Sequence, residues 1–350
     1  MNNFSSMLFA ALKPPIPTLT LPLKGRGYSG CINRPLTKKL IFLLALITLC
    51  SVYCTNSFAT EAKPFSFALM GDVPYHDGEV MDVERMLGEV SSENMDFVVH
   101  VGDFKSGSSR CTDELFLHRK QLFNQSLHPF IYVPGDNDWT DCMRKSAGGY
   151  FAKERLAKLR ELFFADNQSL GRNKISLQQQ SDDPLFTTYR ENVRWSRENV
   201  LFVSLNIPGS NNNTGNSSSD EEEARLRNIA NAAWLKQAFA LAKLQNFAGV
   251  MFFIQADPMF EYGSSHQGLR AYREFLDLLR EETEMFSGQV VMAHGDTHFY
   301  RVDQPLRNFK KGGRIKNFTR VEVFGSPAIN WIRVRVDANS KDVFSFQPAR

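Results

Sequence analysis

The chain has 350 residues, and its 43% hydrophobic and 12% aromatic content can fill the core of one large α/β domain or two small ones. Its formal net charge of +3 depends on six Lys and Arg residues before residue 60, in a segment with no acidic residue. From residue 60 onward, 35 basic residues face 38 acidic ones, which gives a net charge of −3. This lack of a basic excess argues against a protein that binds nucleic acid.

Two segments precede the globular part of the chain. Residues 1–37 are rich in Pro, Leu and Gly without periodicity, and we interpret them as a mis-start or an unstructured leader. Residues 38–59 combine a basic start, a short apolar run and the small residues Ser57 and Ala59, a pattern typical of a signal peptide. We therefore expect an exported protein, periplasmic or extracellular, with no stable membrane insertion after signal removal. A retained membrane anchor is the alternative.

Removal of the signal leaves two cysteines, Cys111 and Cys142, in a chain bound for an oxidising compartment. This predicts one disulfide between them. Two separate buried thiols are the alternative interpretation.

Residues 60–350 are predicted to form a single domain in which apolar runs alternate with amphipathic segments. Most of the apolar runs are continuously hydrophobic, as in strands covered on both faces. The predicted strands are 65–70, 97–101, 130–133, 200–206, 250–254 and 290–293, with more clearly alternating strands at 321–324 and 331–336. The predicted helices are 80–90, 112–124, 151–164 and 220–244, and residues 165–199 read as a polar insertion.

The helix predicted over 220–244 has the clearest signals. Ser219 with Glu222 is predicted to form a capping box at its start. An apolar stripe at helical spacing is predicted to pack in the core, and it comprises Leu226, Ile229, Ala230, Ala233, Trp234, Ala238 and Leu241.

Five predicted strands are each followed by an aspartate, and four of these aspartates come directly after a glycine. The five are Asp72, Asp103, Asp136, Asp257 and Asp296. Ligands of α/β sheets bind beyond the carboxyl ends of the strands, and a glycine there lets the chain turn sharply. Carboxylates that meet in one crevice repel one another and become protonated unless cations neutralise them. The sequence therefore predicts a site for two divalent metal ions.

The ligand types restrict the metals. Oxygen-rich sites suit Mg²⁺, Mn²⁺ or Ca²⁺, whereas His298, two residues after Asp296, adds a nitrogen ligand that also admits Fe or Zn.

These motifs resemble those of the calcineurin-like metallophosphoesterases over residues 65 to about 300. That family carries, in order, Asp-X-His, Gly-Asp, Gly-Asn-His-Asp/Glu, an isolated His after a strand, and Gly-His-X-His. The corresponding stretches here are Gly71–Pro74, Gly102–Asp103, Gly135–Asp138, Gln255–Pro258 and Gly295–His298. The resemblance implies a four-layer αββα sandwich with the metal centre at one edge of its two sheets.

The chain departs from the family pattern at several ligand positions. Pro74 stands where the first motif has a His, Asp136 where an Asn is usual, and Asp296 where the last motif has its first His. Near the fourth motif Ala256 cannot be a ligand, and either Gln255 or Asp257 can take its place. By resemblance, one metal takes Asp72, Asp103 and His298, and the other takes Asp103, Asp136, Asp257 and Asp296.

The general acid of the family is replaced as well. Asn137 occupies the position of the His that helps to protonate the leaving group, and an amide cannot titrate. His76 and His294 are the other candidates. The alternatives are a solvated loop residue for His76 and a ligand-orienting or core residue for His294.

Three further residues are candidates for contact with a substrate phosphate. Lys105 and Arg110 follow Asp103, and Asn206 follows another strand, although ordinary loop and turn chemistry explains all three equally well. The predicted function is hydrolysis of a small phosphate mono- or diester by a metal-activated water. The alternative is an exported metal-binding pseudoenzyme that acts as a binding module.

Overall fold

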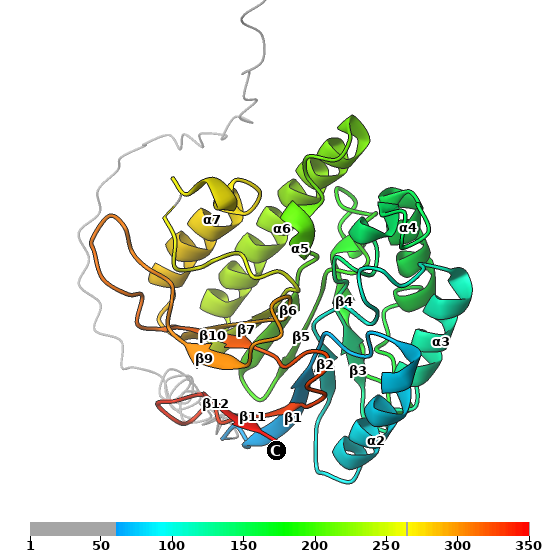
Figure 1. Cartoon of the computed structure of the whole chain (residues 1–350). Coiled ribbons are helices and arrows are strands. Elements are labelled where there is room, and N and C mark those ends of the chain that lie inside the picture. The colour runs from blue at the N-terminus through cyan, green and yellow to red at the C-terminus, as the bar shows by residue number, and fades with distance from the viewer. Residues whose placement is uncertain (1–60, 264, 350) are drawn as a thin grey trace, which may run out of the picture. The chain divides into compact units, whose positions relative to one another are not determined.

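The strands form two sheets that lie face to face between two groups of helices (Figure 1). This computed structural model describes residues 61–263 and 265–349. The leader and the signal peptide predicted from the sequence lie outside the described residues, and residues 60–350 group into one compact unit.

The first sheet has the strand order β12-β11-β1-β2-β3. Its strands β1, β2 and β3 run parallel, and β11 pairs with β1 in the antiparallel direction. The bounds are β1 (Phe65–Met70), β2 (Val98–His100), β3 (Phe130–Tyr132), β11 (Ile332–Val336) and β12 (Phe344–Pro348).

The second sheet has the strand order β4-β5-β6-β7-β8-β10-β9. Strands β6, β7, β8 and β10 form its parallel centre, and antiparallel strands complete both edges. The bounds are β4 (Gln178–Gln179), β5 (Val193–Arg197), β6 (Val200–Ser204), β7 (Gly249–Phe253), β8 (Gln289–His294), β9 (Arg301–Asp303) and β10 (Phe318–Glu322).

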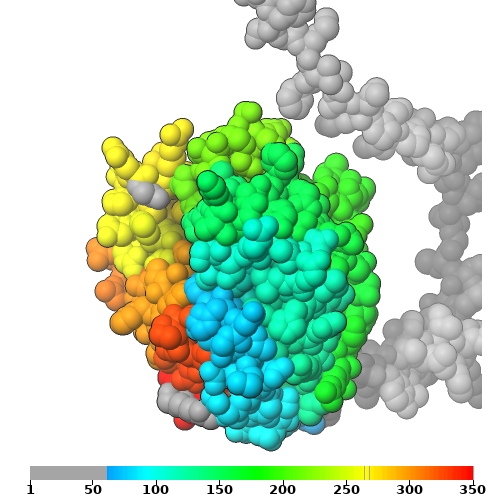
Figure 2. Space-filling model, turned by 45° about the vertical axis from the view of Figure 1, so that its right-hand side comes forward, coloured from blue at the N-terminus to red at the C-terminus, as the bar shows by residue number. Residues whose placement is uncertain are grey.

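The helices cover the outer faces of the two sheets. Helices α2 (Val80–Ser91), α3 (Asp113–Phe123) and α4 (Ala152–Phe163) pack on the first sheet, and their segments form a continuous blue-to-green face in Figure 2. Helices α6 (Ser218–Leu244) and α7 (Arg273–Glu284) pack on the second sheet. Shorter turns are η1 (Asp77–Glu79), η2 (Thr140–Met143), η3 (Gln180–Asp182), η4 (Gln267–Leu269) and α5 (Gly209–Asn212).

Three apolar cores follow from the alternation of side chains along the strands. In β1, Phe67 and Leu69 point between the sheets, whereas Ala68 and Met70 point to the helices. The core between the sheets is rich in aromatic rings, and Phe67 stacks on Phe97 at 4.5 Å between centroids. The predicted αββα sandwich is confirmed.

Two details of helix α6 differ from the sequence prediction. Ser217, rather than Ser219, caps the helix, and its Oγ accepts a hydrogen bond from the N–H of Asp220. Leu226 and Ile229 are 43% and 51% exposed rather than buried. The buried face is rotated because Arg227 is fully buried, where it binds Glu223 and backbone carbonyls.

The segment 165–199 is part of the second sheet. It contributes β4 and β5 at the sheet edge, and its Glu191 is buried against Arg160 of α4 at 2.5 Å. Some polar residues of this segment therefore form buried ion pairs, and others lie in surface loops.

The predicted disulfide between Cys111 and Cys142 is confirmed, with the two Cα atoms 5.7 Å apart. It joins the loop after β2 to the turn η2 after β3. No helix in the described part of the chain is both long and apolar enough to cross a bilayer.

We predict that replacing both cysteines by alanine lowers the free energy of unfolding by about 2–4 kcal/mol, because the bridge closes a loop in the unfolded chain. Urea unfolding of the variant and of the wild type, each with and without reductant, measures this difference. Reductant should destabilise only the wild type. An unchanged midpoint for the reduced wild type would contradict the structural role of the bridge.

Candidate metal centre

The backbone is strained where the strands of the two sheets end. Asp72, Asp103, Asp296 and His298 all have left-handed φ angles, between 53° and 81°. Such angles are uncommon for residues other than glycine and cost about 1–3 kcal/mol each, so they persist where the surrounding structure enforces them. Here they direct the side chains of distant segments into one crevice.

The glycines before the aspartates serve mainly to make room. Of the four Gly-Asp glycines, only Gly102 has a positive φ, at 98°. A Cβ at Gly135 would overlap Asp103 Oδ1, and a Cβ at Gly295 would overlap Asp72 Oδ2. The sequence argument therefore identified the right glycines, but the physical reason for two of them is close packing against carboxylates.

Four of the five predicted aspartates converge. Gln255 Nε2 lies 3.3 Å from Asp103 Oδ2, 3.2 Å from Asp136 Oδ1 and 3.4 Å from Asp296 Oδ1. The N–H of Asp296 donates to Asp72 Oδ1 at 3.2 Å. Carboxylates from the ends of β1, β2, β3 and β8 thus meet in one buried cluster.

The Gln255 amide has a defined orientation. Its Oε1 accepts hydrogen bonds from the N–H groups of Asp136 and Gly209, at 3.2 and 2.6 Å. Because both partners are donors, the other amide atom must be the nitrogen, and this nitrogen faces the carboxylates. In this orientation Gln255 donates hydrogen bonds to the cluster and does not offer it a ligand oxygen.

Burial makes the cluster electrostatically unfavourable when its carboxylates are ionised. Burial raises the pKa of Asp72 and of Asp103 well above its usual value. Burial, followed by repulsion from Asp136, raises the pKa of Asp296 to about 7. Asp72 Oδ2 is buried with no hydrogen-bond partner among the described residues. An orphaned oxygen among four crowded carboxylates fits a divalent cation.

His298 is prepared to offer one nitrogen to this cluster. The Ser326 carbonyl lies 2.8 Å from its Nδ1, and a carbonyl can only accept, so Nδ1 carries the proton. Nε2 then carries a lone pair, which accepts a hydrogen bond from the Tyr75 hydroxyl at 2.7 Å and lies 3.8 Å from Asp72 Oδ1. This carbonyl-to-histidine arrangement is typical of a metal-ligating imidazole.

Asn137 holds Asp103 in place. Its Nδ2 donates to Asp103 Oδ2 at 2.7 Å and to the Tyr75 hydroxyl at 3.1 Å, and its N–H donates to Asp103 Oδ1. The amide therefore positions the central carboxylate but has no proton to exchange.

Asp138 organises the loops that carry these groups. Its carboxylate accepts from the N–H groups of Asp103, Phe104 and Gly135 and from the hydroxyl of Tyr132. Burial raises its pKa to about 6, against these hydrogen bonds. This one side chain ties the turn after β2 to the turn after β3.

Asp257 is the predicted aspartate whose carboxylate turns away from the cluster. Its Oδ2 binds Arg301 Nη2 at 2.6 Å, and only its N–H reaches Asp296. Asp257 forms a second group with His294 and Glu322, whose ligand atoms lie within 4.8 Å of one another. Arg301 already forms ion pairs with both carboxylates of this group, because its Nε also lies 2.5 Å from Glu322 Oε2.

The two histidines considered as general acids lie away from the four carboxylates. His76 is exposed and its Nε2 lies 3.3 Å from Glu79. His294 is fully buried; its Nδ1 donates to the Gly295 carbonyl, and burial lowers its pKa. Burial therefore holds His294 neutral, as expected for a structural residue.

The three predicted phosphate contacts are also placed elsewhere. Lys105 is buried and its Nζ donates to the carbonyls of Asn137 and Ser106. Arg110 is exposed. Asn206 is fully buried and donates to Glu191.

Sequence reasoning missed several residues that complete the site. Tyr75 directly follows Pro74, the last residue of the first motif. This adjacency was the available sign that Tyr75 lies in the site. Asp141 and Arg144 follow the third motif in the stretch that also holds Cys142. Ser210, like Asn206, lies beyond the end of a predicted strand, which suggests a pocket residue, although turn chemistry explains that position equally well.

Ser210 reaches the cluster from a left-handed turn. Ser210, Asn211, Asn212 and Asn213 have φ angles of 44°, 56°, 53° and 62° in succession. The Ser210 hydroxyl lies 2.6 Å from Asp136 Oδ2 and 2.7 Å from Asp141 Oδ1. Consecutive residues rarely adopt the left-handed backbone conformation, so this turn is strained. It forms one wall of the site.

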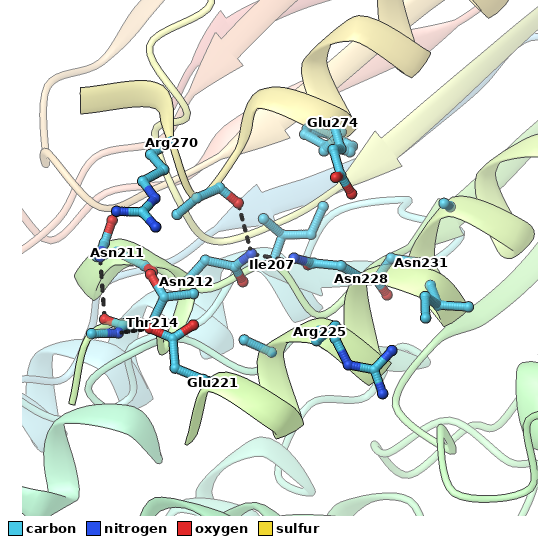
Figure 3. Close-up of a pocket in the computed structure, with 16 residues that line it drawn as sticks. Ile207, Asn211, Asn212, Thr214, Glu221, Arg225, Asn228, Asn231, Arg270 and Glu274 are labelled. Carbon is cyan, nitrogen blue, oxygen red and sulfur yellow. Dashed lines mark hydrogen bonds between the residues drawn. The ribbon is translucent and has the colours of Figure 1, made fainter. Parts of the chain in front are cut away.

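The next residues of this turn line a separate cavity. It has a volume of about 530 Å³ and lies between α6 and the start of α7 (Figure 3). Asn211 and Asn212 form one side of it, and Asn212 Nδ2 donates to Asn228 of α6.

Comparison with known proteins gives matches at the level of structure. No protein-family model matches the sequence, and no curated protein matches it. A dimetal phosphatase from Danio rerio has a TM-score of 0.49 at 13% identity, with 81% of this chain and 95% of that chain covered.

PhoD has a TM-score of 0.49 at 12% identity, with 79% of this chain and 64% of that chain covered. Purple acid phosphatase PPD1 from yellow lupin seeds has a TM-score of 0.43 at 12% identity, with 82% and 54% covered. At such scores and identities, the chemistry must be judged from the side chains of the site.

Because the pKa of Asp296 is raised, we predict that removing its charge increases the free energy of unfolding, and that this increase depends on pH. The folded protein binds this proton more tightly than the unfolded chain, whose pKa is near 3.8, so the cost to stability grows as pH rises from about 4 to about 7. In the presence of chelator, Asp296→Asn should raise the free energy of unfolding by on the order of 1–3 kcal/mol at pH 8 and by roughly a third of that at pH 5, where only part of the titration range has been crossed.

Urea unfolding at the two pH values measures this effect. Asp82→Asn, a half-exposed aspartate of α2, is the matched control and should show no such gain. An equal effect of Asp296→Asn at both pH values would contradict the raised pKa of Asp296.

Proposed function

We propose that the chain is a metal-dependent hydrolase of small phosphate mono- or diesters. The observation that carries this proposal is the convergence of Asp72, Asp103, Asp136 and Asp296 with an orphaned buried oxygen on Asp72. Such a cluster of buried carboxylates is tolerable when cations neutralise it.

The residues that would hold divalent ions are these four aspartates and His298. Two of the four, Asp136 and Asp296, stand at positions where the metallophosphoesterase motifs carry an asparagine and a histidine. Bound divalent ions would supply Lewis acidity toward a phosphate oxygen and an acidified water. The largely oxygen donor set favours Mn²⁺, Mg²⁺ or Ca²⁺, and the single imidazole also admits Fe or Zn.

The chain's own groups define the rest of the reaction. Hydrolysis forms a bond from phosphorus to the water oxygen, breaks the ester P–O bond and delivers one proton to the leaving oxygen. Asn137 cannot supply that proton, and His76 and His294 lie away from the cluster. We infer that solvent protonates the leaving group, which favours esters with good leaving groups.

The alternative is an exported binding module that keeps the metals and has lost turnover. The orientation of Gln255 favours this alternative, since its amide nitrogen faces three carboxylates where the family offers a ligand. The disulfide agrees with export to an oxidising compartment, which stays part of the proposal.

The test measures metal content and turnover together. Elemental analysis of the purified protein should find bound divalent metal, and nitrophenyl phosphate mono- or diesters should be hydrolysed with at least one of Mn²⁺, Mg²⁺, Ca²⁺, Fe²⁺ and Zn²⁺. Asp103→Asn should reduce both metal content and kcat/KM, the latter by at least about 100-fold, because Asp103 is central to the cluster.

Asp82→Asn on the surface of α2 should change neither quantity. Metal binding without turnover of any ester would establish the binding module instead. A protein that binds no divalent ion would end both versions of the proposal.

A further inference from the structure

We propose that Arg144, held by Asp141 and Ser210, binds the phosphoryl group of the substrate and selects phosphate monoesters over diesters. This inference rests on the proposed function and names the substrate class for the same site. It replaces the phosphate contacts that the sequence suggested at Lys105, Arg110 and Asn206.

The first argument is the position of Asp141. Its carboxylate side chain is only 7% exposed and lies one serine hydroxyl away from Asp136. A fifth carboxylate at this place adds to the repulsion in the cluster, and burial together with Asp136 raises its pKa. Its compensating partner is Arg144, whose Nη2 lies 2.7 Å from Asp141 Oδ2. We therefore assign Asp141 the role of holding the Arg144 guanidinium in place.

The second argument is the geometry of Arg144 itself. Its side chain is 50% exposed, and Nη2 also lies 3.4 Å from Ser210 Oγ, which in turn binds Asp136. On its other side, a Cβ at Gly107 would overlap Arg144 Nη1 and crowd Asn137 Oδ1. The guanidinium thus lies at the rim, between the Ser210 wall and the Asn137 side of the carboxylate cluster.

The third argument is that the neighbouring cations are already engaged. Lys105 is buried and bound to two backbone carbonyls. Arg301 is bound by Asp257 and Glu322, and buried Arg119 donates to the Phe104 carbonyl. Arg144 keeps guanidinium N–H groups toward solvent, and a guanidinium binds phosphate oxygens in a planar, two-pronged geometry.

The chemistry of the two ester classes gives the selectivity. A monoester has three non-bridging oxygens and carries up to two negative charges, whereas a diester has two such oxygens and one charge. The additional oxygen needs a charge-assisted donor, and Arg144 supplies it at the rim. A diester places a carbon substituent there, which a guanidinium does not bind.

The experiment compares kcat/KM for nitrophenyl phosphate and bis-nitrophenyl phosphate in the full protein loaded with its most activating metal. Arg144→Ala should lower kcat/KM for the monoester by about tenfold or more and leave the diester within about twofold. The loss should be mainly in KM. Arg144→Lys should recover part of the monoester rate, because it keeps charge but loses the planar fork.

Arg85→Ala is the matched control, since Arg85 is an exposed arginine in an i,i+3 ion pair with Asp82 on α2. It should leave both rates unchanged. Equal losses on both esters for Arg144→Ala, or no loss on either, would overturn the inference while leaving the proposed hydrolase intact. Absence of turnover by the wild type would instead refute the proposed function.

Discussion

The site depends on one electrostatic constraint, the crowding of four aspartate carboxylates in a buried crevice. Burial raises the pKa of Asp72, Asp103 and Asp296, so the cluster favours bound protons or bound cations over free anions. The strained backbone at these aspartates and the glycines packed against their oxygens bring the charges together despite this cost. Both sheets contribute, because the parallel strands of each end at the same edge of the sandwich.

The constraint also explains the substitutions relative to the metallophosphoesterase pattern. Asp136 stands at the position of an asparagine and Asp296 at that of a histidine, so the proposed centre is richer in oxygen ligands than the family pattern. The remaining imidazole, His298, has its tautomer set by the Ser326 carbonyl. Gln255 and Asn137 contribute amide N–H groups that hold carboxylates without adding charge. Under the proposed function, these changes favour harder metal ions and protonation of the leaving group by solvent.

Several rigid connections hold the loops around the carboxylate cluster in place. The Cys111–Cys142 bridge and the Asp138 carboxylate both tie the loop after β2 to the turn after β3. The left-handed turn at Ser210 closes the third side and links Asp136 to Asp141. Carboxylates that repel one another keep their positions only when the loops that carry them are rigid. The same rigid loops hold Arg144 at a defined point on the rim of the site.

The sequence by itself determined the buried strands and the aspartates that follow them, because buried parallel strands and the turns after them leave strong local patterns. The four-layer sandwich was predicted from the resemblance of the ordered motifs to a known family. Whether a side chain after a strand faces the crevice was decided by tertiary structure. Asp257 turns to Arg301 from β9, Lys105 turns inward to carbonyls, and Ser210 enters from a loop with no motif. Partners distant in the chain set these orientations, and spacing along one sequence carries no information about which distant charge a side chain will find.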